Sequence, residues 1–154
     1  MRTSVMVPVR GAQDARSVAG LVQSLLDRDG VGKVTLVRVV PYALAVVGDY
    51  VLDPADVARA DAEQRAQGEA FLRDVAGRVR WGSTDHEIVA LLGDEPDALT
   101  RFAARRGFDL IVMASPKRTW LGRVLAGNLI DRTLDAVGVP ITVLPDREPL
   151  SQEG

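Results

Sequence analysis

The stretch Asp109–Pro145, DLIVMASPKRTWLGRVLAGNLIDRTLDAVGVPITVLP, decides the fold. It opens with a short apolar run at Leu110–Met113, which is rich in β-branched residues. Apolar residues then recur at helical spacing over 121–137, and Gly138 marks the helix end before a second apolar run at Pro140–Leu144. The order strand, loop, helix, strand predicts a βαβ unit whose two strands are parallel.

The rest of the chain repeats this alternation. Apolar runs and helical periodicities follow one another from the N-terminus, so the whole order is β α β α β α β α β. This order predicts an α/β fold with one five-stranded parallel sheet and helices on both faces. The remaining strands are expected at Ser4–Val9, Lys33–Val40 and Glu87–Leu92, and the remaining helices near Ala15–Leu26, from Pro54 and from Asp94, with Asp29-Gly30 and Gly32 ending the first and Gly107 the third.

Composition excludes several classes of protein. The 154 residues suit one domain, and the absence of cysteine excludes disulfides, cysteine nucleophiles and thiolate metal sites. One histidine is too few for a histidine-rich metal site, and a net charge of −2 argues against generic nucleic-acid binding. Without an apolar run of transmembrane length, no membrane partner is expected, and the composition fits a cytoplasmic location.

The connection Pro41–Asp53, PYALAVVGDYVLD, is more apolar than a solvated loop requires. We expect several of its apolar residues to be buried, either under the start of the second helix or at a subunit contact. These residues are Leu44, Val46, Val47, Tyr50 and Val51. The first half of the following helix is polar and alanine-rich, so it is expected to project over solvent.

Three short motifs carry a family resemblance. DLIVMAS at 109–115, the segment through AGN at 126–128, and VPITVLP at 139–145 resemble the universal stress protein family in sequence and spacing. The resemblance implies an adenine nucleotide alpha hydrolase-like sandwich with strand order 3-2-1-4-5. It covers a domain at 1–146, followed by a polar tail at 147–154. It also implies a homodimer in which the strand Pro140–Leu144 pairs with its symmetry mate.

The nucleotide-binding motif of that family is altered in this chain. Ala114 and Lys117 stand at two glycine positions, Asn128 at the hydroxyl position, and Arg10 where an acid at the end of strand one contacts the nucleoside. Lys117 restricts the loop if the backbone requires positive φ there, and Arg10 removes an acceptor. Gly127 is retained. The other positions compatible with the site are Pro8, Val9, Val39, Met113 and Pro116.

Two interpretations of the new cations remain open. Arg10, Lys117 and Arg118 lie at the carboxyl ends of strands expected to be neighbours, so with helix N-termini they could bind a small anion. Alternatively, these side chains extend into water or pair with carboxylates, which is the usual behaviour of long cationic side chains.

Other polar residues favour structural interpretations. His86, just before the third strand, has no surrounding ligand set. The acids Asp94, Glu95 and Asp97 fit capping and dipole pairing at a helix start better than a metal site. The basic strip on the third helix is expected to be solvated, and Trp120 fits a lid, a dimer contact or a packing anchor equally well. The strip consists of Arg101, Arg105 and Arg106.

The sequence therefore predicts a non-enzymatic regulatory module of the universal stress protein kind. It would act through a homodimer and an unidentified protein partner, without a cofactor. No catalytic motif of the hydrolase, pyrophosphatase or P-loop type is present. The alternative is a nucleotide-binding member that binds ATP or AMP, with at most weak ATPase activity.

Overall fold

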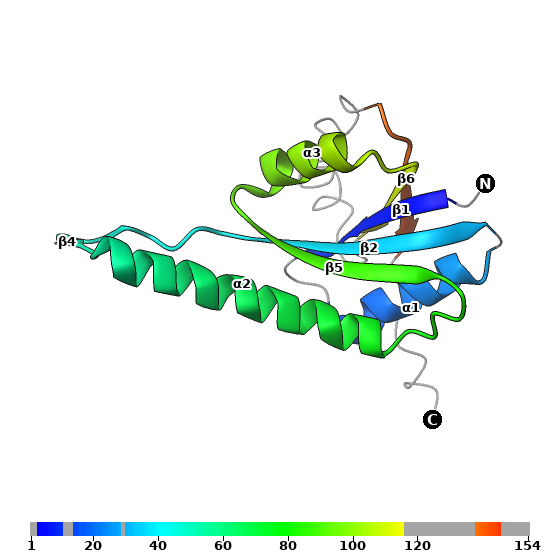
Figure 1. Cartoon of the computed structure of the whole chain (residues 1–154), viewed down its shortest axis with the longest axis horizontal. Helices are drawn as coiled ribbons and strands as arrows, with labels where there is room; N and C mark the ends of the chain where they lie inside the picture. Colours follow the sequence, from blue (N-terminus) through cyan, green and yellow to red (C-terminus); the bar gives the residue numbers. More distant parts are fainter. Residues whose placement is uncertain (1–2, 11–13, 29, 116–137, 146–154) are drawn as a thin grey trace.

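The computed structural model describes residues 3–10, 14–28, 30–115 and 138–145. Its main sheet has five parallel strands in the order β5-β2-β1-β6-β7 (Figure 1). Counted along the chain, this is the expected order 3-2-1-4-5. The strands are β1 (Thr3–Pro8), β2 (Val31–Val40), β5 (Asp85–Leu92), β6 (Leu110–Ser115) and β7 (Ile141–Pro145).

Helices cover both faces of this sheet, as expected. The helices α1 (Ala15–Leu26) and α2 (Pro54–Gly77) lie on one face, and α3 (Glu95–Arg106) lies on the other (Figure 1). Because both faces are covered, the strands read as nearly continuous apolar runs.

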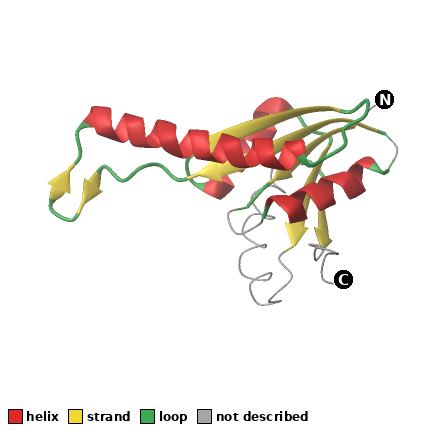
Figure 2. Cartoon of the chain, turned by 90° about the horizontal axis from the view of Figure 1, so that it is seen from below, coloured by secondary structure: helices red, strands yellow, loops and turns green. Residues whose placement is uncertain are grey.

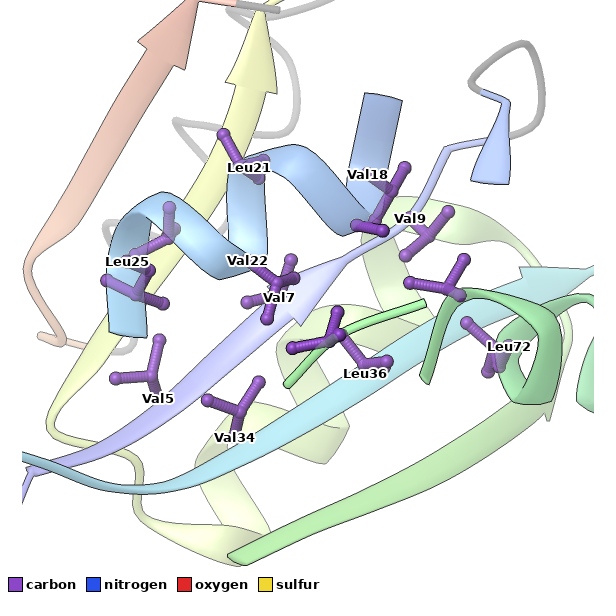
Figure 3. Close-up of a cluster of buried hydrophobic side chains, with 14 of the residues drawn as sticks. Val5, Val7, Val9, Val18, Leu21, Val22, Leu25, Val34, Leu36 and Leu72 are labelled. Atoms are coloured by element: carbon purple, nitrogen blue, oxygen red, sulfur yellow. The ribbon is translucent and has the colours of Figure 1, made fainter. Parts of the chain in front are cut away.

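Alternate residues of the strands fill two separate cores. On β1, Val5 and Val7 point toward α1 and α2, and Figure 3 shows them among Val22 and Leu36. Met6, between them in sequence, packs in the second core under α3 with Leu99. The two-residue period of a strand therefore divides one apolar run between two cores.

Several expected element boundaries differ from the structure. The first helix ends at Leu26, and Gly32, expected to help end it, lies inside β2, which begins at Val31 rather than Lys33. The third main strand begins at Asp85 rather than Glu87. Register explains both early starts, since Val31 pairs with Thr3 of β1 and Asp85 pairs with Lys33 of β2.

The connection from Pro41 to Asp53 forms an arm that leaves the body of the molecule. It carries a small antiparallel hairpin, β3 (Val46–Val47) and β4 (Tyr50–Val51), beyond the N-terminal end of α2 (Figures 1 and 2). The expectation that its apolar residues are buried under the second helix is wrong within this chain: Leu44 is 71% exposed and Tyr50 78% exposed. The helix begins beside the hairpin and runs back toward the sheet, so it does not cover these side chains (Figure 2).

The long helix α2 has two unlike halves. Gly68, Leu72 and Val75 in its second half are buried against the sheet. Residues 54–67 of its first half are exposed or partly exposed, as expected from their polar and alanine-rich sequence. Asp53 caps this half by accepting a hydrogen bond from the Ala55 amide at 3.1 Å. Within the described residues, no helix is long and apolar enough to cross a membrane.

Candidate functional site

The carboxyl edge of the sheet is the candidate site because loops there lead into helix starts. In open α/β sheets, ligands bind at this edge. β1 ends at Pro8 and its chain continues to Arg10, while β5 ends at Leu92 and leads through Gly93 into α3. Gly93 has a φ of 140°, a conformation that L side chains rarely adopt, so the turn into α3 favours glycine.

An ion pair joins two of these loops across the edge. Arg10 Nε donates to Glu95 Oε1 at 2.9 Å, although the two residues are 85 positions apart in sequence. The two side chains are 23% and 32% exposed, so the contact is partly shielded from water. Arg10 therefore pairs with a carboxylate that compensates its charge, which is the second of the two interpretations given for the cationic residues.

The acidic residues at the start of α3 have different roles. Asp94 occupies the N-cap position, but its side chain makes no capping hydrogen bond, contrary to the expected capping. Glu95 and Asp97 lie in the first turn, where the helix dipole favours negative charge. Glu95 therefore combines a favourable helix position with the contact to Arg10. Among the described residues, no group of three or more acidic or histidine side chains is suited to a metal ion.

The apolar positions carried over from the family are not all brought together. Val9 is 3% exposed and packs in the core under α1 (Figure 3). Val39 and Met113 pack in the opposite core under α3. Pro8 is buried at the end of β1. Val39 and Met113 thus share a face of the sheet with α3, whose first turn holds Glu95, and alternation along β1 places Pro8 on the same face as Met6.

Much of the expected phosphate loop lies outside the described residues. Ala114 is within β6, where its backbone is in register with Leu144. Pro116, Lys117, Arg118, Trp120, Gly127 and Asn128 fall in the part of the chain that is not described. The geometry of the expected anion site is therefore known only at Arg10.

Two other polar positions have structural surroundings. His86 lies within β5 rather than before it, and its ring stacks on Trp81 with centroids 4.1 Å apart and planes 7° apart. Trp81 Nε1 donates to the Ala76 carbonyl at 2.9 Å. In the basic strip, Arg106 is not simply solvated as expected, because it binds Glu87 and lies over the Phe102 ring, 5.2 Å from its centroid.

The sequence interpretation missed the pairing of Arg10 with Glu95. The positions of the two residues could have indicated this contact, since both follow strands whose carboxyl ends lie at one edge of a parallel sheet. From the sequence, the acids at the helix start after β5 indicate only capping and pairing with the helix dipole.

Comparisons with known proteins agree with this architecture. A model of the Universal stress protein family matches residues 1–145. Among solved structures, the chain is similar to universal stress protein UspA from Lactobacillus plantarum, with 18% identity, a TM-score of 0.64, and coverage of 94% of this chain and 99% of that one. No curated protein gives a significant match.

Two further structures show the same likeness. A universal stress protein family member from Burkholderia pseudomallei has 20% identity and a TM-score of 0.57, with 93% of this chain and 96% of that chain covered. A family member from Arabidopsis thaliana, solved with AMP bound, has 18% identity and a TM-score of 0.60, with coverage of 94% and 92%. At these identities the likeness concerns the fold.

Proposed function

Because this chain belongs to the universal stress protein family, we propose that it is a non-enzymatic regulatory member that does not bind ATP in the family manner. It acts in stress response through a homodimer and contacts with a partner protein. The observation that carries this proposal is the ion pair between Arg10 and Glu95. Arg10 stands at the position where the family resemblance implies an acid that contacts the nucleoside.

The ion pair affects nucleotide binding in two ways. The position at the end of β1 holds a cation and lacks the acceptor that a ribose hydroxyl requires. The guanidinium is also held in place by Glu95 at 2.9 Å, so moving it aside to admit a nucleoside breaks a partly buried ion pair. Lys117 at a glycine position acts in the same direction if the loop requires positive φ.

The edge position of β7 supports the proposed dimer. Among the described residues β7 is the last strand in the sheet order, and the Ile111 amide donates to the Pro140 carbonyl at 2.9 Å. Since backbone groups alternate in direction along a strand, the groups of Ile141 and Val143 point away from β6. An apolar edge with free backbone groups requires a cover, and antiparallel pairing with the same edge of a second copy supplies one.

Replacing Val143 with proline tests this pairing. Val143→Pro removes an edge donor and leaves the ladder to β6 intact, so we expect the β7 pairing to be lost and the mass of the assembly to fall by at least half in light scattering at tens of micromolar. Thr142→Pro is the matched control, because Thr142 faces β6 and its replacement should unfold the edge of the sheet. A wild-type monomer, or a Val143→Pro variant with unchanged mass and circular dichroism, would contradict the β7 dimer.

Thermal unfolding with nucleotides tests the lack of ATP binding. We expect no stabilisation of the wild type by millimolar ATP, ADP or AMP with magnesium. A ligand present at one hundred times its dissociation constant would stabilise the fold by about 2.7 kcal/mol, which such a measurement detects readily. Clear stabilisation by ATP would overturn the proposal.

The alternative function is nucleotide binding by a member with at most weak ATPase activity. Gly127 at a family glycine position and the AMP-bound relative from Arabidopsis thaliana favour it. In that case Arg10 and Lys117 would contact phosphate or nucleoside. Lys117→Gly would then weaken binding of the nucleotide. Stabilisation by phosphate or sulfate alone, abolished by Lys117→Gly, would instead indicate a small-anion site.

A further inference from the structure

The arm presents an apolar tip to solvent. Four side chains of the hairpin and its approach form this tip, with exposures of 71% for Leu44, 55% for Val46, 78% for Tyr50 and 78% for Val51. Together they expose on the order of 500 Å², as much as the largest apolar patch of a typical monomer. The hairpin has strands of two residues, and an isolated hairpin is at best marginally stable in water. The tip therefore requires a partner surface.

A groove runs along the root of the same arm. One wall is a row of alanines on α2, Ala58, Ala62 and Ala66, which share a helix face because they are four residues apart. Leu92, at the end of the edge strand β5, also lines the groove, which has a volume of about 400 Å³. Small side chains on the wall leave room for bulky ones from a partner.

The tip is acidic, and the groove is lined by one cation, Arg65, together with two carboxylates. Of these carboxylates, Asp61 accepts a hydrogen bond from the Ala43 amide at 2.6 Å, and Glu69 pairs with Arg73. Between Pro41 and Asp53 the tip region has acidic residues and no cation, and Asp49 lies at its hairpin turn. In the groove, Arg65 donates Nε to the Ala90 carbonyl at 3.1 Å. The salt bridges described on α2 join other residues, so the partner of Arg65 in the described part of the chain is neutral. Those salt bridges are Arg59 with Asp56, Arg73 with Glu69, and Arg78 with Asp74.

We propose that a second copy of this chain docks on the arm, with the two arms antiparallel and each tip in the groove of the other. This arrangement is isologous, so every contact occurs twice. The two tips alone would bury about 1,000 Å², the lower bound for a specific interface, and the grooves add a matching area. Asp49 of each copy would approach Arg65 of the other, which fixes the register.

This interface does not depend on the proposed function or on the β7 dimer. The groove lies beside β5, at the opposite edge of the sheet from β7. A chain that uses both interfaces forms an assembly larger than a dimer, and a chain that uses only the arm forms a dimer. Removing the tip should therefore reduce the mass of the wild-type assembly by at least half in either case.

Cysteine pairing tests the contact directly, because the natural chain has no cysteine. We expect the variant with Val51→Cys and Ala62→Cys to form a covalent dimer on mild oxidation. A bond within one chain is excluded, since the hairpin with Val51 lies beyond the N-terminal end of α2 (Figure 2), Ala62 lies about 12 Å along α2 from Pro54, and a disulfide requires Cα atoms within about 7 Å. Val51→Cys with Ala104→Cys is the matched control, because Ala104 is an exposed alanine on α3. Equal cross-linking in both variants would overturn the proposal.

Light scattering separates the two interfaces. The variant with Leu44→Ser, Tyr50→Ser and Val51→Ser should fold as the wild type does, because these side chains are exposed, and its assembly should have at most half the mass. Val143→Pro in the same experiment reports on β7 alone. If the tip variant keeps the wild-type mass at every concentration, or if the wild type is a monomer, the arm interface does not exist.

A charge exchange tests the register. Asp49→Arg and Arg65→Asp should each raise the dissociation constant of the arm interface about tenfold, and the two changes together should restore it to within about threefold. Additive weakening in the double variant would contradict the proposed contact between these residues.

Discussion

The two ends of the sheet each hold an arginine–glutamate pair, but in unlike surroundings. At the amino end, Glu87 accepts from Arg106 and from the Thr35 hydroxyl at 3.1 Å, and Lys33 Nζ lies 3.6 Å away. This pair joins two strands to α3 over a fully buried threonine. At the carboxyl end, Arg10 and Glu95 join two loops instead. The comparison indicates that the first pair supports the fold, whereas the second occupies the place where a ligand would bind.

The largest expected effect is at the amino end. Glu87→Ala removes the acceptor of the buried Thr35 hydroxyl, so we expect a loss of about 1–3 kcal/mol in the free energy of unfolding. Urea denaturation measures it. Glu87→Ala combined with Thr35→Val is the control, because it removes both partners, and it should be less destabilised than Glu87→Ala alone. Equal losses in the two variants would mean that the hydrogen bond is not the cause.

The alternation of strands and helices and the two helical layers could be predicted because apolar periodicity and helix-ending glycines are local features of the sequence, whereas the strand order was implied by the family resemblance. The run from Asp109 to Pro145 contains a strand, a loop, a helix and a strand in order. The sequence did not predict the exposed tip of the arm. Leu44, Val46, Tyr50 and Val51 have the composition of buried residues, and composition does not distinguish burial within the chain from burial by a partner.

The sequence could point to the edge of the sheet as the candidate site, but not to the contacts made there. The altered residue at the end of β1 was identifiable from the motif, and so was the helix start after β5. Their contact depends on how the carboxyl ends of strands meet across the sheet. A side-chain pair separated by 85 residues leaves no local pattern. The carried-over apolar positions divide between the two cores, because Val9 and Met113 face opposite sides of the sheet.

A smaller effect is expected at the start of α1, which follows the carboxyl end of β1. Asp14 accepts a hydrogen bond from the Ser17 amide at 2.8 Å, and this bond lowers the pKa of the Asp14 carboxyl below its ordinary value. Asp14→Ala should destabilise the fold by about 1 kcal/mol in urea denaturation near neutral pH.

The pH dependence of this cap has a definite sign. Because the folded pKa is lowered, the stabilisation is present above the ordinary value of about 3.9 and is lost as the pH falls through the lowered pKa. The difference between the wild type and Asp14→Ala should therefore shrink below about pH 4. Asp14→Ser retains a capping oxygen without the charge and is the matched control. A difference that does not change with pH would contradict this account.

The smallest effect on stability is expected from Glu95→Gln. The pair with Arg10 is partly exposed, so its loss should change the free energy of unfolding by about 1 kcal/mol or less. High salt should reduce the difference from the wild type, because ions screen an accessible pair. A loss as large as that of Glu87→Ala would remove the distinction between the two ends of the sheet.

Calorimetric titration with ATP and magnesium tests the central claim, that the altered carboxyl edge excludes nucleotide. The decisive variant carries Arg10→Asp and Glu95→Gln, so that the new acid does not face a like charge. It also carries Ala114→Gly, Lys117→Gly and Asn128→Ser, which restore the family motif. We predict no binding by the wild type at millimolar ATP and a measurable dissociation constant for the variant, which disappears when Arg10 is restored. Tight ATP binding by the wild type would contradict the account.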